Sequence, residues 1–137
     1  ARLMSLAGAD LLIYPTAIGW DLSDDIHERE RQLDAWVTIQ RAHAIANGVP
    51  VLVANRTGFE ADPYNPKQGI EFWGNSFVAG PQGEFLSRAS STEQGYISAE
   101  IDMERAEAVR RIWPYLRDRR VDAYQGITKR WLADKEL

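Results

Sequence analysis

The sequence contains no cysteine and only two histidines, His27 and His43, among its 137 residues. The absence of cysteine excludes disulfide bonds, thiolate metal sites and a cysteine nucleophile from this chain. Two histidines leave little material for a metal centre. Nor do the serines, histidines and lysines occur at a spacing that would assemble a nucleophile, a base and a cation for acyl transfer.

Long apolar runs and basic stripes are also missing. The longest apolar run, residues 11–14, is far too short to span a bilayer, and the first residues do not resemble a targeting signal. The formal net charge is -4, and aromatic and acidic residues interrupt even the basic cluster at residues 110–120. We therefore expect a soluble, cytoplasmic protein that binds neither membranes nor nucleic acid.

The residues that are present have the balance of a globular domain. Hydrophobic residues make up 45% of the chain and charged residues 26%, which is typical of one soluble domain or part of one. Glycine, proline and tryptophan are spread along the sequence, without repeats or low-complexity linkers.

The pattern of the first half is helix, strand, helix, strand. Residues 2–7 predict a helix without an N-cap that ends at Gly8, which suggests a chain cut from a longer one. The apolar runs at 11–14 and 50–55 predict strands buried on both faces. Between them, we expect a loop at 16–26 and a helix at 28–47.

The second half predicts shorter elements separated by turn residues. They are a polar loop at 59–71, a strand at 72–79, a turn at 80–83 leading to a hairpin strand at 84–89, a strand at 96–101, a helix at 103–112 capped by Asp102 and a short helix at 127–132. The two apolar strands need cover on both faces, and the chain offers few helices. We expect the missing cover to lie in residues outside this chain.

Five segments occur in the order and spacing of a known family. They are 14–19 (Tyr-Pro-Thr-Ala-Ile-Gly), 36–50 (Trp-Val-Thr-Ile-Gln-Arg-Ala-His-Ala-Ile-Ala-Asn-Gly-Val-Pro), 54–58 (Ala-Asn-Arg-Thr-Gly), 72–77 with 80–84, and 117–120 with 122–124. Any one of them would be weak evidence, because such turn chemistry is common. Together they make nearly the whole chain resemble the C-terminal half of the N-carbamoylputrescine amidases, in the nitrilase superfamily of carbon-nitrogen hydrolases.

This resemblance implies an α/β fold that is the C-terminal half of a nitrilase-like α-β-β-α sandwich. Residues 1–137 would be a partial carbon-nitrogen hydrolase domain that begins just after the turn carrying the nucleophile. In the family a catalytic Cys, a Glu and a Lys belong to the N-terminal half, so no catalytic residue is assigned to this chain. The resemblance implies no cofactor and no metal, and it implies a homo-oligomer.

The resemblance also indicates a substrate-binding segment, Thr16, Ala17, Ile18, Gly19 and Trp20, directly after the first apolar strand. In open α/β sheets, ligands bind at the carboxyl ends of the strands. The alternative is a tight loop packed on Trp20. The acids that follow, Asp21, Asp24, Asp25 and Glu28, either recognise the ammonium group of a carbamoylated diamine or, as we favour, are helix-start acids.

Other polar and aromatic residues have plainer interpretations. We expect His43 to be a hydrogen-bonded core or interface residue rather than a base, and Asn55-Arg56 to close a turn or place a polar group near the pocket. The aromatic residues Trp73, Trp113 and Tyr115 suit subunit contacts. Residues 117–122 contain the arginines and aspartates of an ion-pair network that would lock the tail.

The implied reaction of the complete protein is hydrolysis of the carbamoyl C-N bond of N-carbamoylputrescine to putrescine, carbon dioxide and ammonia, as in polyamine biosynthesis. The substrate would be a small-molecule carbamoyl amine. A ureidopropionase-like or aliphatic amidase activity is the alternative within the class. A catalytically inactive assembly module is the alternative from another class.

Overall fold

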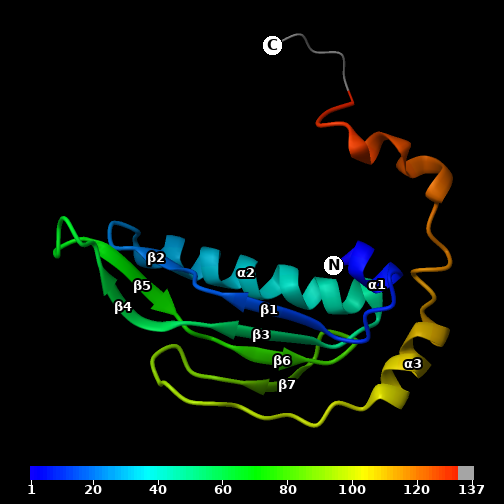
Figure 1. The fold of residues 1–137 in the computed structure, drawn as a ribbon, viewed down its shortest axis with the longest axis horizontal. Coiled ribbons are helices and arrows are strands. Elements are labelled where there is room, and N and C mark those ends of the chain that lie inside the picture. The colour runs from blue at the N-terminus through cyan, green and yellow to red at the C-terminus, as the bar shows by residue number, and fades with distance from the viewer. Residues whose placement is uncertain (133–137) are drawn as a thin grey trace.

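The computed structural model describes residues 1–132, and its centre is a four-stranded sheet (Figure 1). The strand order is β1 (Leu12–Thr16), β3 (Val51–Asn55), β6 (Phe77–Ala79) and β7 (Phe85–Arg88). β1 and β3 are parallel and are joined by the long helix α2 (Ile26–Asn47), while the other neighbours are antiparallel. The mixed α/β class predicted from the sequence is confirmed.

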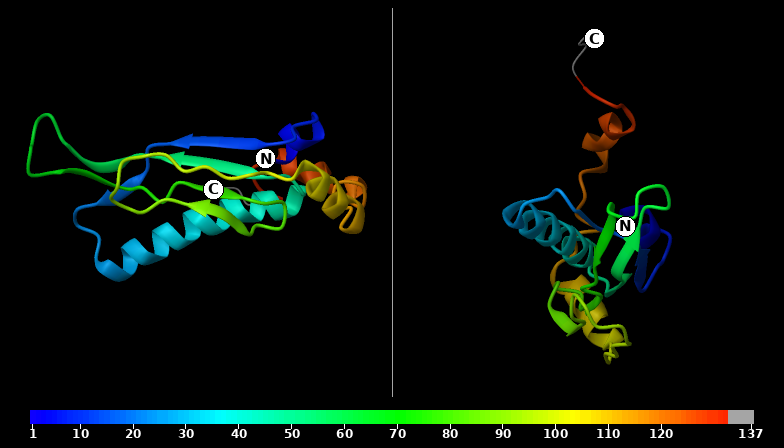
Figure 2. Two further views of the ribbon diagram at one scale, coloured as in Figure 1. Left: turned by 90° about the horizontal axis from the view of Figure 1, so that it is seen from below. Right: turned by 90° about the vertical axis from the view of Figure 1, so that its left-hand side faces the viewer.

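The helix α2 lies along one face of this sheet (Figures 1 and 2). Its start is fixed by Asp25, whose carboxylate accepts a hydrogen bond from Glu28 N at 2.9 Å, and its end by Gly48 in the left-handed conformation at φ 61°. Branched side chains of the helix and the sheet interlock between these two layers. The core consists of Leu12, Val37, Ala44, Val49, Val51, Val53, Phe77 and Ala79.

The predicted apolar strands are present, but β1 is buried on one face only. Leu12 is 1% exposed and packs toward α2, whereas Ile13, on the opposite face, is 60% exposed. The difference arises because α2 covers a single face of the sheet among the described residues (Figure 2). The expectation of burial on both faces is therefore not met within residues 1–132.

A second, smaller sheet occupies two regions that the sequence predicts to be loops. It has the order β2 (Gly19–Asp21), β5 (Gly69–Trp73), β4 (Thr57–Ala61), and all its pairs are antiparallel. The loop predictions for 16–26 and 59–71 are wrong at these strands. Cross-strand pairing holds these strands, and only Phe72 and Trp73 at the end of β5 are buried, so apolar alternation is weak.

The strand predicted at 72–79 is divided by a corner at Gly74 and Asn75. Both residues have positive φ, 57° and 56°, which turns the chain from the small sheet into β6. A Cβ atom on Gly74 would lie 2.7 Å from Ser91 O, so the corner also needs glycine for space. The hairpin that follows, β6 to β7, is confirmed.

Residues 96–101 form no strand, which corrects the prediction. Burial still alternates along the segment, with Ile97, Ala99 and Ile101 partly buried and their neighbours exposed. No described strand pairs with the segment, so its backbone has no ladder in which to hydrogen-bond. The alternating sequence pattern therefore reflects one partly buried face of an extended segment, which pairs with no described strand.

Short helices lie toward both ends of the described residues. α1 (Arg2–Leu6) precedes β1, and α3 (Met103–Ile112) begins at Asp102, whose carboxylate accepts a hydrogen bond from Arg105 N as predicted. The short helix predicted at 127–132 is wrong, because a 3-10 helix spans Val121–Thr128 instead. The predicted domain, residues 1–137, continues past the described part. Within that part, no helix combines the length and the apolar character that a membrane crossing requires.

Candidate functional site

The candidate site lies where the parallel strands β1 and β3 end. Thr16, the last residue of β1, is directly opposite Asn55, the last residue of β3. The chain then leaves β1 through Ala17 and Ile18 into β2. This is the edge at which open α/β sheets bind ligands.

Asn55 holds the beginning of the predicted substrate-binding segment. Its Oδ1 accepts a hydrogen bond from Ile18 N at 3.0 Å, and its Nδ2 donates to Ile18 O at 3.0 Å. The Thr16 hydroxyl lies 3.0 Å from both Asn55 Oδ1 and Ala54 O. Ala17 and Ile18 remain exposed between these anchors.

The end of the segment is held by the small sheet and by α2. Gly19 pairs with Phe72 in β5, and a Cβ atom at Gly19 would lie only 2.2 Å from Glu71 O. Trp20 turns away from the strand ends: its Nε1 donates to Arg29 O at 3.0 Å, and its ring packs edge-on against Trp73 at 5.5 Å between centroids. The structure therefore brings Thr16 and Ile18 together through Asn55 and places Trp20 in an aromatic contact.

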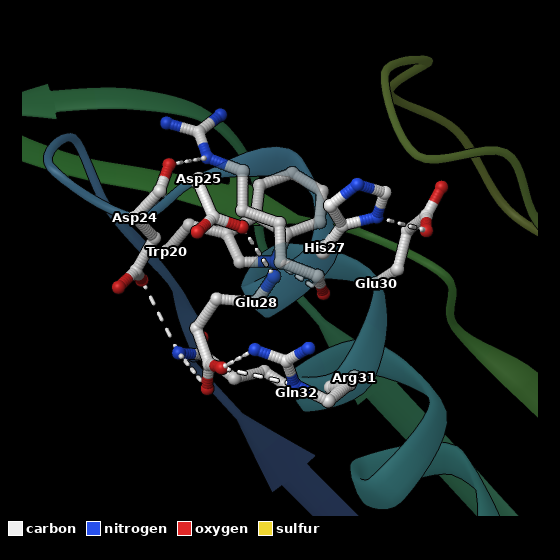
Figure 3. A network of polar contacts seen from close by, with 9 residues as sticks. Trp20, Asp24, Asp25, His27, Glu28, Glu30, Arg31 and Gln32 are labelled. Carbon is white, nitrogen blue, oxygen red and sulfur yellow. Dashed lines mark hydrogen bonds and ion pairs between the residues drawn. The ribbon is translucent and has the colours of Figure 1, made fainter.

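The acidic residues after the segment serve the start of α2 (Figure 3). Asp25 caps the helix, and Asp24 Oδ2 accepts hydrogen bonds from Asp21 N and Gln32 Nε2, both at 3.2 Å. Glu28 accepts from Arg31 Nε at 3.1 Å. These contacts support the helix-start interpretation of the acids, because most of their oxygens have partners within the turn.

Hydrogen bonding favours the ionised form of two of these carboxylates, Asp21 and Glu28. The Ser23 hydroxyl, followed by the Ser23 amide, lowers the pKa of Asp21 below its ordinary value. Hydrogen bonds from Arg31 and Gln32 lower the pKa of Glu28 in the same way. The start of α2 therefore presents stable negative charge within one turn of the candidate segment.

His43 has the structural role predicted for it. Its Nδ1 lies 3.0 Å from the hydroxyl of Tyr14, and this pair joins α2 to β1. Burial lowers the pKa of His43 and raises the pKa of Tyr14.

Asn55, by contrast, has a larger role than a turn closure. Its side chain contacts Ile18 and Thr16, which lie 37 and 39 positions earlier in the sequence. The only sequence signal for these contacts is a polar residue at the end of an apolar strand.

The aromatic residues divide into two groups. Trp73 is only 2% exposed and packs against Trp20 and Trp36, so its prediction as a subunit contact is wrong for this chain. Trp113 and Tyr115 are exposed and stack on each other with centroids 6.2 Å apart. Their exposed rings are therefore accessible for the subunit contacts that the sequence predicts.

The predicted ion-pair network of the tail consists of local pairs. Arg117 pairs with its neighbour Asp118 at 2.7 Å, and Arg120 with Asp122. All four side chains are largely exposed, and neither pair reaches another element, so their contribution to stability is small. The pairs do not lock the tail to the sheet.

A cavity of about 760 Å³ lies beside the candidate segment without containing any of its residues. Asn55, Ser76, Arg88 and the loop at 93–97 line it, so Asn55 is common to the cavity wall and to the segment's anchor. Within residues 1–132, no three histidine, aspartate or glutamate side chains converge as metal ligands. The polar side chains that line the cavity carry hydroxyl, amide and guanidinium groups and, at Glu93, a carboxylate.

The fold is a mixed α/β layer in which one long helix covers one face of a four-stranded sheet, and comparison with known proteins identifies the family. Residues 1–111 match the carbon-nitrogen hydrolase family. A carbon-nitrogen hydrolase from Helicobacter pylori has 55% identity and a TM-score of 0.91, over 96% of this chain and 45% of that one. The chain therefore belongs to the carbon-nitrogen hydrolases of the nitrilase superfamily.

Two curated relatives are similar to this chain over most of its length. The chain is 39% identical over 127 residues to N-carbamoylputrescine amidase from Oryza sativa, which covers 91% of this chain and 41% of the rice protein. It is 32% identical to citrullinase from Francisella tularensis, over 96% of this chain and 44% of that protein. The chain thus spans less than half the length of these relatives.

Proposed function

We propose that this chain is the C-terminal part of a carbon-nitrogen hydrolase that acts on N-carbamoylputrescine. Water would be consumed at the carbamoyl carbon, and putrescine, carbon dioxide and ammonia would be released. The similarity to the rice N-carbamoylputrescine amidase along 91% of this chain is the observation that carries the proposal. The chain covers 41% of that relative, which fits an enzyme whose active site is built from an N-terminal and a C-terminal half.

The chain would supply the substrate side of the site. An acyl transfer from a carbamoyl group needs a strong nucleophile, a base and donors for the developing oxyanion. The nucleophilic Cys, the Glu and the Lys would come from the N-terminal half, since this chain has no cysteine. Residues Thr16, Ala17, Ile18, Gly19 and Trp20 would form a wall of the pocket, held at the ends of β1 and β3.

A second candidate substrate is citrulline, which the match to a citrullinase favours. Citrulline and N-carbamoylputrescine both carry a terminal ureido group on an alkyl chain that also bears an ammonium group. They differ in the carboxylate that only citrulline has. The acids at the start of α2 would favour the substrate without that carboxylate, because like charges repel.

Exposed apolar surface supports a homo-oligomer in solution. Leu3 and Met4 on α1 are exposed, as are Trp113 and Tyr115 after α3. Apolar and aromatic side chains of this kind are typical of subunit interfaces. We propose that the complete, cytoplasmic protein assembles from identical subunits, which mass photometry would measure directly.

The test begins with the DNA upstream of the segment that encodes Ala1. A reading frame that continues through a cysteine-bearing turn would support an enzyme, whereas a start codon at this point would favour an inactive assembly module. The protein from the longest frame should release ammonia and putrescine in equal amounts from N-carbamoylputrescine. Release from citrulline alone would assign the second candidate, and release from neither would overturn the proposal.

A further inference from the structure

The side-chain amide of Asn55 directs its hydrogen bonds to one small region. Its Oδ1 lies 3.0 Å from Ile18 N and 3.0 Å from Thr16 Oγ1. Its Nδ2 donates to Ile18 O and to Gly74 O, again at 3.0 Å each. Both donor hydrogens of the amide are therefore used, and its oxygen accepts from Ile18 N and shares the Thr16 hydroxyl with Ala54 O.

These bonds join three segments that are far apart in the sequence. Thr16 and Ile18 belong to the exit from β1, Asn55 ends β3, and Gly74 begins the left-handed corner between the two sheets. The backbone of Asn55 is fixed as well, because Asn55 N donates to Ser76 Oγ at 2.9 Å. Asn55 itself is therefore anchored by its place in β3 and by Ser76, which precedes β6, while its side chain holds the exit from β1.

The contacts with Ile18 have a specific consequence for the pocket segment. One side chain binds both the N–H and the C=O of the same residue, as a neighbouring strand would. This fixes the two peptide planes on either side of Ile18 and so the direction in which Ala17 and Gly19 present their backbone groups. Thr16 is held in β1 and Gly19 in β2, so the contacts to Asn55 fix the exposed turn, Ala17 and Ile18, that lies between them.

We propose that Asn55 is a positioning residue for the substrate pocket, which orients the backbone of residues 16–19 without touching the substrate. This inference rests on the proposed function, because it takes those residues as a pocket wall. A simple turn closure needs a single hydrogen bond. The positioning role requires both N–H donors of the Asn55 amide and its acceptor oxygen. Aspartate has the same shape but no donor, so it would face Ile18 O and Gly74 O with repulsion.

The decisive experiment compares Asn55→Asp with Asn65→Asp in the complete protein. Asn65 lies in the exposed turn at 62–68, where its Oδ1 accepts only a local bond from Lys67 N at 3.4 Å. The measurements are kcat and KM for N-carbamoylputrescine, the melting temperature, and hydrogen–deuterium exchange of the peptides that contain residues 16–20.

We expect Asn55→Asp to lower kcat by about 100-fold, the loss typical of a reacting geometry displaced by an ångström. Exchange at residues 16–20 should become faster, while the folded fraction at the assay temperature stays complete. Asn65→Asp should change neither quantity. If Asn55→Asp does not fold, Thr16→Val removes one of the contacts to Asn55 while keeping the side-chain shape, and should give a smaller loss of kcat with faster exchange.

Two results would overturn the positioning role: wild-type kcat in folded Asn55→Asp, or unchanged exchange at residues 16–20. The exchange measurement does not depend on turnover. A parent protein that hydrolyses no ureido substrate would therefore refute the proposed function, while the exchange rates of the same variants would still decide whether Asn55 holds the segment.

Discussion

Tyr14 on β1 and His43 on α2 are joined by a hydrogen bond of 3.0 Å between the phenol oxygen and Nδ1. Their rings lie 5.8 Å apart between centroids, so the polar contact is combined with packing. This pair ties the long helix to the strand that leads into the candidate site. The neutral imidazole is the form that fits there, since burial lowers the pKa of His43.

The first prediction is a loss of stability in weak acid. Above the ordinary His pKa of 6.5, His43 is neutral in both the folded and the unfolded chain, and its contact contributes fully. As the pH falls below that value, the unfolded chain takes up a proton that the folded chain resists, so the free energy of unfolding decreases. The loss levels off below the lowered pKa of the folded state.

Denaturant titrations from about pH 8 to about pH 5 would measure this effect. His43→Gln should reduce the slope of unfolding free energy against pH. His27→Gln is the matched control, because His27 is exposed at the start of the same helix, and it should keep the parent slope. Equal slopes for the parent and His43→Gln would contradict the prediction.

The elements that were predicted correctly are those with strong local signals. The apolar runs of β1 and β3, the end of the long helix at Gly48 and the cap at Asp102 act within a few residues. The small sheet lacks such signals, because β4 and β5 depend on pairing across a polar turn. Residues 96–101 show the reverse case, with a strand pattern but no strand beside it.

The candidate site was predictable only in part. The residues 16–20 follow an apolar strand and match a family motif, so their position at the strand ends was expected. The role of Asn55 was not, because it depends on the parallel register that sets Thr16 opposite Asn55. Likewise Trp73 looked like a surface residue, since only the folded chain places Trp20 and Trp36 around it.

The second prediction concerns the cap of α2. Asp25→Ala removes the acceptor for Glu28 N and should lower the free energy of unfolding by about 1 kcal/mol. Asp25→Asn should cost much less, because an asparagine oxygen caps a helix nearly as well. Thermal unfolding of both variants would measure the difference. Equal losses would show that the charge of Asp25, rather than its hydrogen bond, stabilises the helix.

The third prediction separates structural acids from an acid that recognises the substrate. Asp21 is adjacent to Trp20, and the hydrogen bonds that its carboxylate accepts from Ser23 N and Ser23 Oγ both use a single oxygen, Oδ1. Asp21→Asn in the complete protein should raise KM for N-carbamoylputrescine roughly two- to fivefold, the range of an exposed ion pair. KM for butylurea, which lacks the ammonium group, should not change.

Asp25→Asn is the control for this measurement, since the carboxylate of Asp25 is engaged by the helix. It should leave KM for both ureas unchanged. If Asp21→Asn affects the cationic and the neutral urea alike, none of its effect arises from charge recognition. The acid would then belong to the helix start alone.

The fourth prediction tests the close approach of Gly19 to β5. A Cβ atom at this position would lie 2.2 Å from Glu71 O and 2.6 Å from Glu71 C, and backbone atoms cannot rotate away. Gly19→Ala should therefore separate β2 from β5 and lower the free energy of unfolding by about 1–3 kcal/mol. Gly95→Ala is the control, because a Cβ atom there meets nothing within 4 Å. Similar melting temperatures for the two variants would refute the steric argument.

The last prediction concerns residues 1–137 expressed alone. β1 is an edge strand of the four-stranded sheet, and Ile13 exposes its side chain on the uncovered face. Exposed apolar edges promote association between chains, so the isolated chain should aggregate, and without a cysteine it should release no ammonia from N-carbamoylputrescine. Ile13→Lys should reduce light scattering more than Ile39→Lys, which changes an exposed position on α2. Turnover by a clean preparation would contradict the prediction that the chain alone is inactive. Equal scattering from the two lysine variants would show that the exposed face of β1 does not cause the aggregation.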